Sequence, residues 1–322
     1  MASNALKFMA GALLSVVSIA ATAQKFPERP IRLILGVAPG GGQDTIARAM
    51  SPRLAKVLGV NTIVDNRPGG SGTIGVEIAK QAAPDGHTLL MISASNVIHP
   101  LLYGAPYDLL RDFAPVGQLV TQPYLLVVPQ ALPVKSVNDL IAYAKAQPGK
   151  LNFGSAGNGT VTHLAAELFT EQAHVEATHV PYKGMGPVYP DLIAGRVQMA
   201  FSTIVSAQGH VKANRLRALA VTSAKRTPSA PGVPTLAESG LPGYAVTQWY
   251  GVLAPVATPR TIVGTLSGAF AGVVQEPDMA EYFARDGAEG ASSTPQQFAA
   301  HLKSEQERWN RVIKRPGLQG LK

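Results

Sequence analysis

The stretch IRLILGVAPGGGQD, residues 31–44, joins an apolar run of strand type to a loop rich in glycine. A helical pattern follows, because apolar residues recur every four positions and Gly59 stands where the helix would end. The apolar face consists of Ile46, Met50, Leu54 and Leu58. Pro52 lies inside this pattern, and we expect it to kink the helix or to begin a second segment with Ser51 as N-cap. The stretch therefore predicts a strand, a loop and a helix in succession.

The same order recurs along the chain, which predicts an α/β fold with helices layered around mostly parallel sheets. Further strand-like runs lie at 62–64, 88–92, 124–128 and 218–221, and helical patterns at about 137–146, 162–172, 187–194, 262–274 and 295–312. The β-like segments 124–129 and 249–255 both end in proline. We expect these two segments to pair and to link two lobes, so that the second lobe is an insertion in the first.

The glycine loop of residues 38–44 has two interpretations. Its three consecutive glycines leave backbone amides uncovered, so these N–H groups and the N-terminus of the following helix can hold an anion. Alternatively, the loop is only a tight turn in which Asp44 interacts favourably with the helix dipole. Its spacing matches neither the dinucleotide fingerprint nor the phosphate loop of NTPases.

A second loop repeats this arrangement. Residues 151–153 form a short strand-like run, GSAGNGT at 154–160 supplies hydroxyls and amides, and a helix is expected from about Thr162. Hydrogen bonds to an ionised carboxylate are strong, so converging donors suit such a ligand without a countercharge. The strand end SASN at 93–96 fits the rule that ligands bind beyond the carboxyl ends of strands. The glycine-rich segment 66–72 is expected to be a structural turn.

Composition limits the classes of function. The chain has 322 residues, a net charge of +8 without a long basic run, and no cysteine. Nucleic-acid binding would need clustered basic residues with aromatics, and thiol catalysis and cysteine metal sites are excluded. The seven histidines show no metal-ligand spacing, and no Gly-x-Ser-x-Gly elbow occurs. We expect no metal, no cofactor and no catalytic residues, with His163 as a capping or packing residue.

The N-terminus has the pattern of an export signal. Lys7 precedes an apolar run from Phe8 to Ala20, and the small residues Ala21-Thr22-Ala23 follow. The run is too short and too rich in small residues for a membrane anchor. We therefore expect cleavage after Ala23 and a periplasmic mature protein.

Short motifs in a fixed order resemble the solute-binding family of tripartite tricarboxylate transporters, also called the TctC or Bug family. They extend from about Phe26 to the C-terminal helix. Besides the loop at 38–44, they are PIRLI at 30–34, NRPG at 66–69, PDGHTLL at 84–90, PYD at 106–108, DFAPV at 112–116, HVPYKG at 179–184, DLIAG at 191–195, RALAV at 217–221, PTLAE at 234–238 and WYG at 249–251.

The resemblance implies a type II-like periplasmic binding protein, whose two α/β lobes close around a ligand like a Venus flytrap on a hinge of crossing strands. We expect a signal peptide at 1–23, the first lobe at 24–123 and 249–322, and the second lobe at 124–248. A ligand carboxylate would lie between the two glycine loops. Carried onto this sequence, the binding residues are Gly41, Gly42 and Asp44 in the first loop and Ser155, Gly157, Gly159 and Thr160 in the second. We add as candidate binding residues Ser93 and Ser95 at their strand end and Ser202 and Thr203 after the Met-Ala-Phe stretch.

Two departures from the family pattern bear on the ligand. Gly36-Val37 stands where relatives often have Pro-Phe, and Ser202 follows Met199-Ala200-Phe201 where relatives frequently have Asp. An amino-acid ligand would need that carboxylate for its ammonium group, so its absence favours a plain aliphatic or aromatic carboxylic acid.

The resemblance also implies partners. They are the membrane subunits of a transporter driven by an ion gradient, and we expect the binding protein itself to be a monomer. Two alternatives remain, namely the ligand-binding subunit of a sensor system and an exported hydrolase or isomerase.

Overall fold

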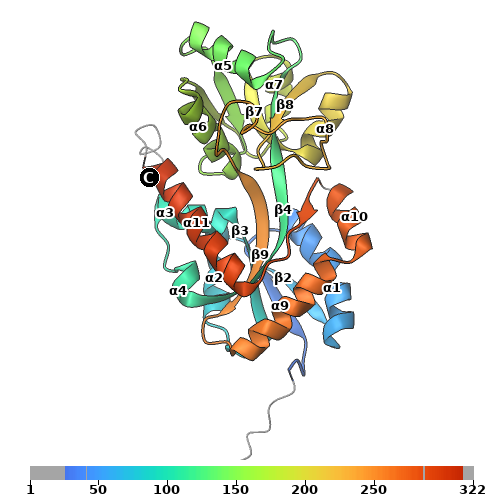
Figure 1. The fold of residues 1–322 in the computed structure, drawn as a ribbon. Coiled ribbons are helices and arrows are strands. Elements are labelled where there is room, and N and C mark those ends of the chain that lie inside the picture. Colours follow the sequence, from blue (N-terminus) through green and yellow to red (C-terminus); the bar gives the residue numbers. More distant parts are fainter. Residues whose placement is uncertain (1–25, 41, 286, 315–322) are drawn as a thin grey trace, which may run out of the picture.

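The computed structural model describes residues 26–40, 42–285 and 287–314, so the predicted signal peptide lies outside the described residues. Figure 1 shows two lobes connected by two long strands, β4 (Phe113–Pro129) and β9 (Thr247–Pro255). In the part of the chain that the structure describes, no helix has the length and apolar character needed to cross a bilayer.

The two lobes have separate sets of elements. The lower lobe in Figure 1 contains β1 (Ile31–Leu35), α1 (Gly42–Leu58), β2 (Thr62–Asn66), the 3₁₀ turn η1 (Gly70–Gly72), α2 (Thr73–Lys80), β3 (Thr88–Ser93), α3 (Ala94–Tyr103), α4 (Leu109–Asp112), α9 (Arg260–Val274), α10 (Pro277–Arg285), β10 (Glu289–Gly290) and α11 (Pro295–Ile313). The upper lobe contains α5 (Val137–Ala146), β5 (Asn152–Ser155), α6 (Val161–Ala173), β6 (Thr178–Pro181), α7 (Val188–Ile193), β7 (Met199–Thr203), α8 (Ile204–Lys212) and β8 (Leu216–Val221).

Each lobe is built on three parallel strands. These are β2, β1 and β3 in the first lobe and β6, β5 and β7 in the second. The linking strands add antiparallel pairs, because β3 pairs with β9, β9 with β4, and β4 with β7 and β8. The sheets therefore contain more antiparallel strand pairs than the mostly parallel sheets that the sequence predicted. Since the carboxyl ends of parallel strands meet at one edge, the loops after β1, β2 and β3 are neighbours.

Strand β4 is long enough to serve both sheets. Its 17 residues extend on the order of 55 Å at about 3.3 Å per residue. Residues 113–123 pair with β9, and residues 124–129 pair with β7 and β8. The two linking strands pair as expected, but β9 pairs with residues 113–123 of β4. The predicted segment 124–129 pairs with β7 and β8 instead, so this part of the prediction was wrong. Pro115, Gly117 and Pro123 interrupt the first half of the strand, which concealed it in the sequence.

Helix α1 corrects the expectation of a second segment at Pro52. The helix is continuous from Gly42 to Leu58, with Pro52 inside it. The hydroxyl of Ser51 donates a hydrogen bond of 2.8 Å to the carbonyl of Ala47 and does not act as an N-cap. The buried face at Ile46, Met50 and Leu54 holds the helix on the first lobe despite the proline.

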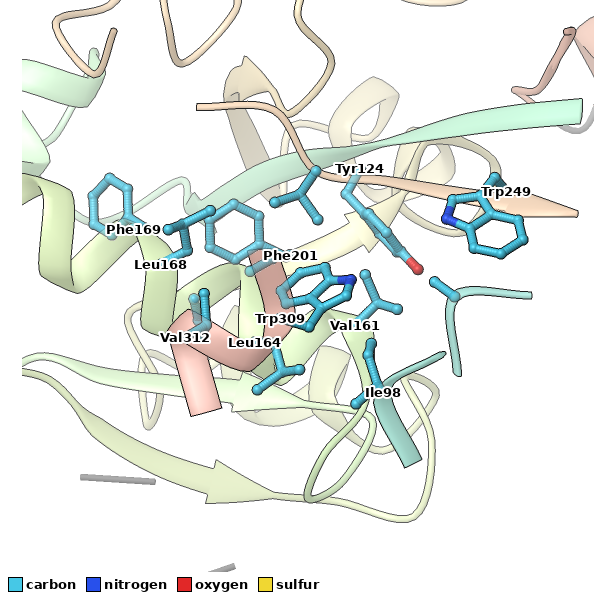
Figure 2. Packing of buried hydrophobic residues seen from close by; sticks show 14 of the residues in the cluster. Ile98, Tyr124, Val161, Leu164, Leu168, Phe169, Phe201, Trp249, Trp309 and Val312 are labelled. Atoms are coloured by element: carbon cyan, nitrogen blue, oxygen red, sulfur yellow. The ribbon is translucent and has the colours of Figure 1, made fainter. Parts of the chain in front are cut away.

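One apolar cluster extends from the first lobe to the second. Figure 2 shows Trp309 of α11 lying near Val161 and Leu164 of α6, with Trp249 of β9 and Ile98 of α3 in the same cluster. Trp249, Trp309 and Leu164 are fully buried. Helix α11 therefore packs on the hinge and on both lobes. The exact residue boundaries of the lobes stay a prediction.

Candidate functional site

A cavity of about 450 Å³ lies where β1, β2 and β3 of the first lobe end. Its walls come from the loops after β1 and β2, the start of α3 and the linking strand β9. The lining residues are Gly36, Val37, Ala38, Gly42, Gln43, Pro68, Gly69, Gly72, Ser93, Ser95, Asn96, Gln248 and Tyr250. A volume of this order is in the range of sites that enclose small molecules.

Three helices begin at this cavity. Helix α1 starts at Gly42, α2 starts after Gly72, and α3 starts after Ser93. The first N–H groups of a helix have no acceptor within the helix, and the helix dipole places partial positive charge there. Among the described residues that line the cavity, none has a charged side chain. The cavity therefore combines neutral donors with positive helix ends, which suits a small anion.

Side chains behind the first loop fix its shape. The carboxylate of Asp44 accepts a hydrogen bond of 2.9 Å from the Gly40 amide and one of 3.0 Å from Arg48. Arg48 also donates to Asn66 at 2.8 Å, and the Asn66 amide donates to the Val37 carbonyl at 3.1 Å. The hydrogen bond from Arg48 is the main reason that the pKa of Asp44 is lowered. The charged carboxylate of Asp44 thus holds the loop against α1 and, through Arg48 and its contact with Asn66, against β2.

Close contacts explain why small residues surround the cavity. A side-chain carbon on Gly42 would lie 3.1 Å from the Tyr250 hydroxyl. Gly72 has a φ of 94°, and a side-chain carbon there would lie 3.1 Å from the Asn96 amide nitrogen. The side-chain oxygen of Asn96 in turn accepts a hydrogen bond of 3.0 Å from the Ser93 amide. The backbones can approach one another only because these positions lack side chains.

The second glycine loop follows β5 in the upper lobe, and its own side chains bind several of its amides. Ala156 N–H donates to Thr162 Oγ1 at 3.0 Å, Gly157 N–H to Ser155 Oγ at 3.1 Å, and Gly159 N–H to His163 Nδ1 at 3.1 Å. The sequence predicted that the amides of this loop are donors for a ligand, but those of Ala156, Gly157 and Gly159 already donate within the loop. The loop is pre-formed, and the first turn of α6 supplies its remaining donors.

The upper loop lies against the lower lobe at one point. A side-chain carbon on Gly159 would come within 2.6 Å of Leu102 and 3.4 Å of the Tyr103 hydroxyl, both at the end of α3. Gly159 has a φ of 70°, which also favours glycine. Helix α3 therefore begins at the cavity and reaches the second loop with its last residues.

Ser155 and His179 have the spacing of a nucleophile and a base, with 2.6 Å between Ser155 Oγ and His179 Nε2. Three observations argue against catalysis. Ser155 is fully buried, its hydroxyl already accepts the Gly157 amide, and burial together with the neighbouring His163 lowers the pKa of His179 to about 4. A general base works best with a pKa near the operating pH. The pair therefore acts as a support for the loop.

The structure brings some of the predicted site residues together and separates others. Gly42, Ser93 and Ser95 line the cavity, and Asp44 lies behind it. Ser202 is fully buried, with its hydroxyl 2.5 Å from that of Tyr189, and Thr203 caps α8 by accepting the Ser206 amide. Gly41 lies outside the described residues. Ser155, Gly157, Gly159 and Thr160 form the upper loop and are not among the residues that line the cavity.

Several cavity residues were missed by the sequence reasoning. Gln248 and Tyr250 extend from β9, whereas Asn96, in the first turn of α3, belongs to the strand end at 93–96 that the sequence had indicated. Gly69 and Gly72 belong to the segment expected to be only a turn, yet both line the cavity. The sequence could have indicated these two residues together, because Gln248 and Tyr250 are two positions apart in a strand and therefore share one of its faces.

Across the described ranges 26–40, 42–285 and 287–314, no group of three or more His, Asp or Glu side chains could hold a metal ion.

Comparison with known proteins gives a consistent result. Residues 46–318 match the model of a family described as the tripartite tricarboxylate transporter family receptor, TctC. A protein from Pseudomonas sp. (strain P51), described as a UPF0065 protein in the tcbD-tcbE intergenic region, is 41% identical over 312 residues, which cover 95% of this chain and 93% of that protein.

Solved structures agree with the family match. An R. palustris protein with adipate is 35% identical with a TM-score of 0.74, covering 90% of this chain and 97% of that one. The protein MatC from Rhodopseudomonas palustris, with bound malate, is 31% identical with a TM-score of 0.73, covering 90% and 100%. The periplasmic binding protein BugD is 30% identical with a TM-score of 0.73, covering 91% and 99%. The expected two-lobed periplasmic binding protein fold is confirmed.

Proposed function

The chain belongs to the tripartite tricarboxylate transporter family of receptors, and on this premise we propose that it binds a small organic carboxylate between its lobes in the periplasm. The ligand would then pass to the membrane subunits of a transporter. The observation that carries the proposal is the cavity at which α1, α2 and α3 all begin and whose described lining has no charged side chain. Such a cavity can hold a carboxylate by hydrogen bonds alone.

The relatives support the choice of ligand class. Two of the solved structures contain adipate and malate, which are both dicarboxylates. The uncharged side chains that the structure describes along the cavity support the preference for a plain carboxylic acid, because they offer no carboxylate as a countercharge to an ammonium group. The ligand we propose is therefore an aliphatic or aromatic carboxylic acid without an amino group.

We assign the two loops different parts in binding. The first loop and the strand end at Ser93 and Ser95 receive the carboxylate in the open protein. Closure on the hinge strands then brings the upper loop, with Gly157 to Thr160 and the first turn of α6, onto the same group. Asp44 contributes by bracing the first loop, since its carboxylate already holds the Gly40 amide and Arg48.

Mass spectrometry of the purified protein under native conditions tests the proposal. A bound organic acid, released on unfolding and identified by its mass, is the expected result. If the protein carries no ligand and a panel of mono-, di- and tricarboxylates leaves its melting temperature unchanged, carboxylate binding is wrong. Turnover of a captured compound would instead favour an exported enzyme.

The proposed delivery to a transporter has its own test. The ligand-loaded protein is expected to be co-isolated with the transporter's membrane subunits, and the ligand-free protein less so. Co-isolation with a membrane sensor kinase alone would overturn this part of the proposal and would leave ligand binding intact.

A further inference from the structure

Two stacked imidazole rings lie beneath the upper glycine loop. His163 is in the first turn of α6 and His179 is on β6, and their ring centroids are 3.8 Å apart with an angle of 10° between the planes. Phe153 of β5 stacks on His179 with centroids 4.8 Å apart. His163 is only 2% exposed. The pair is therefore a rigid, mostly apolar support rather than a mobile surface feature.

The hydrogen bonds of His163 define its protonation state. Nδ1 accepts the Gly159 N–H at 3.1 Å, and Nε2 lies 3.4 Å from a carboxylate oxygen of Glu167. These two contacts assign the neutral tautomer with the hydrogen on Nε2. His179 supports the other end of the loop, because its Nε2 is 2.6 Å from Ser155 Oγ, which accepts the Gly157 N–H.

We propose that His163 is a positioning residue for ligand binding, whose unprotonated Nδ1 holds Gly159 and so keeps the upper loop in the shape that receives a carboxylate. A proton on Nδ1 would place two N–H donors face to face, release the Gly159 amide and weaken binding in mild acid. The inference rests on the proposed function, because it concerns the loop assigned to the ligand.

The groups around His163 determine how it responds to acid. Glu167 on α6, with a side chain 23% exposed, favours a proton on the ring, whereas the stacked His179 on β6 opposes a second charge. The Tyr103 hydroxyl of α3 approaches Gly159 without a charge. Burial, and after it the neighbouring His163, lower the pKa of His179 to about 4, so His179 keeps its contact with Ser155 at mildly acidic pH.

Two substitutions separate the hydrogen-bond role from simple packing. The side-chain oxygen of Asn in His163→Asn can occupy the position of Nδ1 and accept from Gly159, but it cannot be protonated near neutral pH. His163→Gln has a similar amide that reaches the position of Nε2, so Gly159 loses its acceptor. His174→Asn serves as the control, because His174 is exposed at the C-cap of the same helix, where its φ of 51° also suits Asn.

The test uses two readouts at pH 7.5 and pH 5.5. The first is the affinity for adipate or malate, measured by calorimetry on the intact mature protein. The second is amide hydrogen exchange of residues 156–160 in the ligand-free protein, corrected for the intrinsic effect of pH on exchange. The second readout does not depend on any ligand. A failure of the proposed function and a failure of this inference can therefore be told apart.

The wild-type protein and His174→Asn are expected to lose about tenfold in affinity on acidification, as for one lost hydrogen bond, together with protection of the loop. His163→Asn should keep both its affinity and the protection of the loop at pH 5.5. His163→Gln should bind weakly and show an unprotected loop at both pH values. Equal protection of the loop in the wild type and His163→Gln at both pH values would overturn the inference. If neither probe binds the wild type, the exchange result alone decides it.

Discussion

The indole Nε1 of Trp249, on the hinge strand β9, donates a hydrogen bond of 3.0 Å to the carboxylate of Glu305 on α11. Trp309 donates to the same oxygen at 3.0 Å, and Arg308 donates to the other oxygen at 2.7 Å. Glu305 is only 2% exposed. A buried carboxylate with this set of donors fixes α11 to the hinge, and α11 also packs on the upper lobe (Figure 2).

Replacing Glu305 by Ala is expected to lower the free energy of unfolding by about 3–5 kcal/mol, because two buried indole N–H groups and Arg308 lose their acceptor. Urea denaturation monitored by tryptophan fluorescence measures this change in the free energy of unfolding. The neighbouring exposed residue provides the control, and Glu307→Ala should change the value by less than about 0.5 kcal/mol. A loss below about 1 kcal/mol for Glu305→Ala would show that this network does not hold the hinge.

Two glycine substitutions should have opposite effects on stability. A side-chain carbon on Gly251 of β9 would lie 2.1 Å from the Phe298 ring, so Gly251→Ala is expected to destabilise by about 1–3 kcal/mol or more. Gly264 lies inside α9 with open space around it, so Gly264→Ala should stabilise by about 0.5–1 kcal/mol. Thermal unfolding of both variants checks the prediction, which fails if Gly251→Ala melts at or above the wild-type temperature.

Filling the cavity should weaken binding without unfolding the protein. In Gly42→Val the first side-chain carbon would lie 3.1 Å from the Tyr250 hydroxyl, so the larger side chain would displace that hydroxyl and narrow the cavity. We expect a loss of at least about tenfold in carboxylate affinity, since about 1.4 kcal/mol corresponds to that factor. Gly209→Ala, in open space on α8, is the control. Unchanged calorimetric affinity in Gly42→Val would exclude this cavity as the carboxylate site.

The half-buried His179 should make the free energy of unfolding depend on pH. Its pKa is lowered to about 4 by burial and by His163, so between about pH 6.5 and pH 4 the unfolded chain binds the proton and the folded chain does not. The free energy of unfolding is therefore fully retained above pH 6.5 and falls as the pH drops toward 4. After allowance for solvent screening, we expect a loss of about 1–2 kcal/mol.

His179→Gln isolates this contribution, because its amide can still reach Ser155 but does not titrate. Chemical denaturation at several pH values should give a shallower slope for the variant than for the wild type between pH 6.5 and 4. Identical slopes would mean that His179 is not the titrating group.

The sequence predicted the architecture well, because the strand, loop and helix patterns are local. The helix expected from about Thr162 begins at Val161 with Thr160 as its N-cap, and it follows, like the glycine turns after β1 and β5, from short-range chemistry that a single sequence carries. Strand β4 was underestimated, since its prolines and bulges hide a strand whose two halves belong to different sheets. Helix α1 passes through Pro52 because tertiary packing of its buried face outweighs the local cost.

The site was only partly predictable, because a cavity depends on which distant segments meet. Gly42, Ser93 and Ser95 follow the neighbouring strands β1 and β3. The rule that ligands bind beyond the carboxyl ends of strands therefore predicted that they lie together. Gln248 and Tyr250 come from a strand far along the chain, and only the pairing of β9 with β3 brings them to the same cavity. The bracing roles of Asp44 and His163 required coordinates, since either residue also fits a ligand-binding or capping role by sequence.

The most direct test of carboxylate binding is a titration of the ligand-free mature protein with adipate and malate, alongside the uncharged diamides of the same acids, by isothermal calorimetry. At least one dicarboxylate is expected to bind at a single site per chain, and the matched diamide to bind at least about a hundredfold more weakly. Binding of a diamide as tightly as of its acid would contradict recognition of the carboxylate. Absence of binding to these acids and to a wider panel of carboxylates would contradict the proposed function.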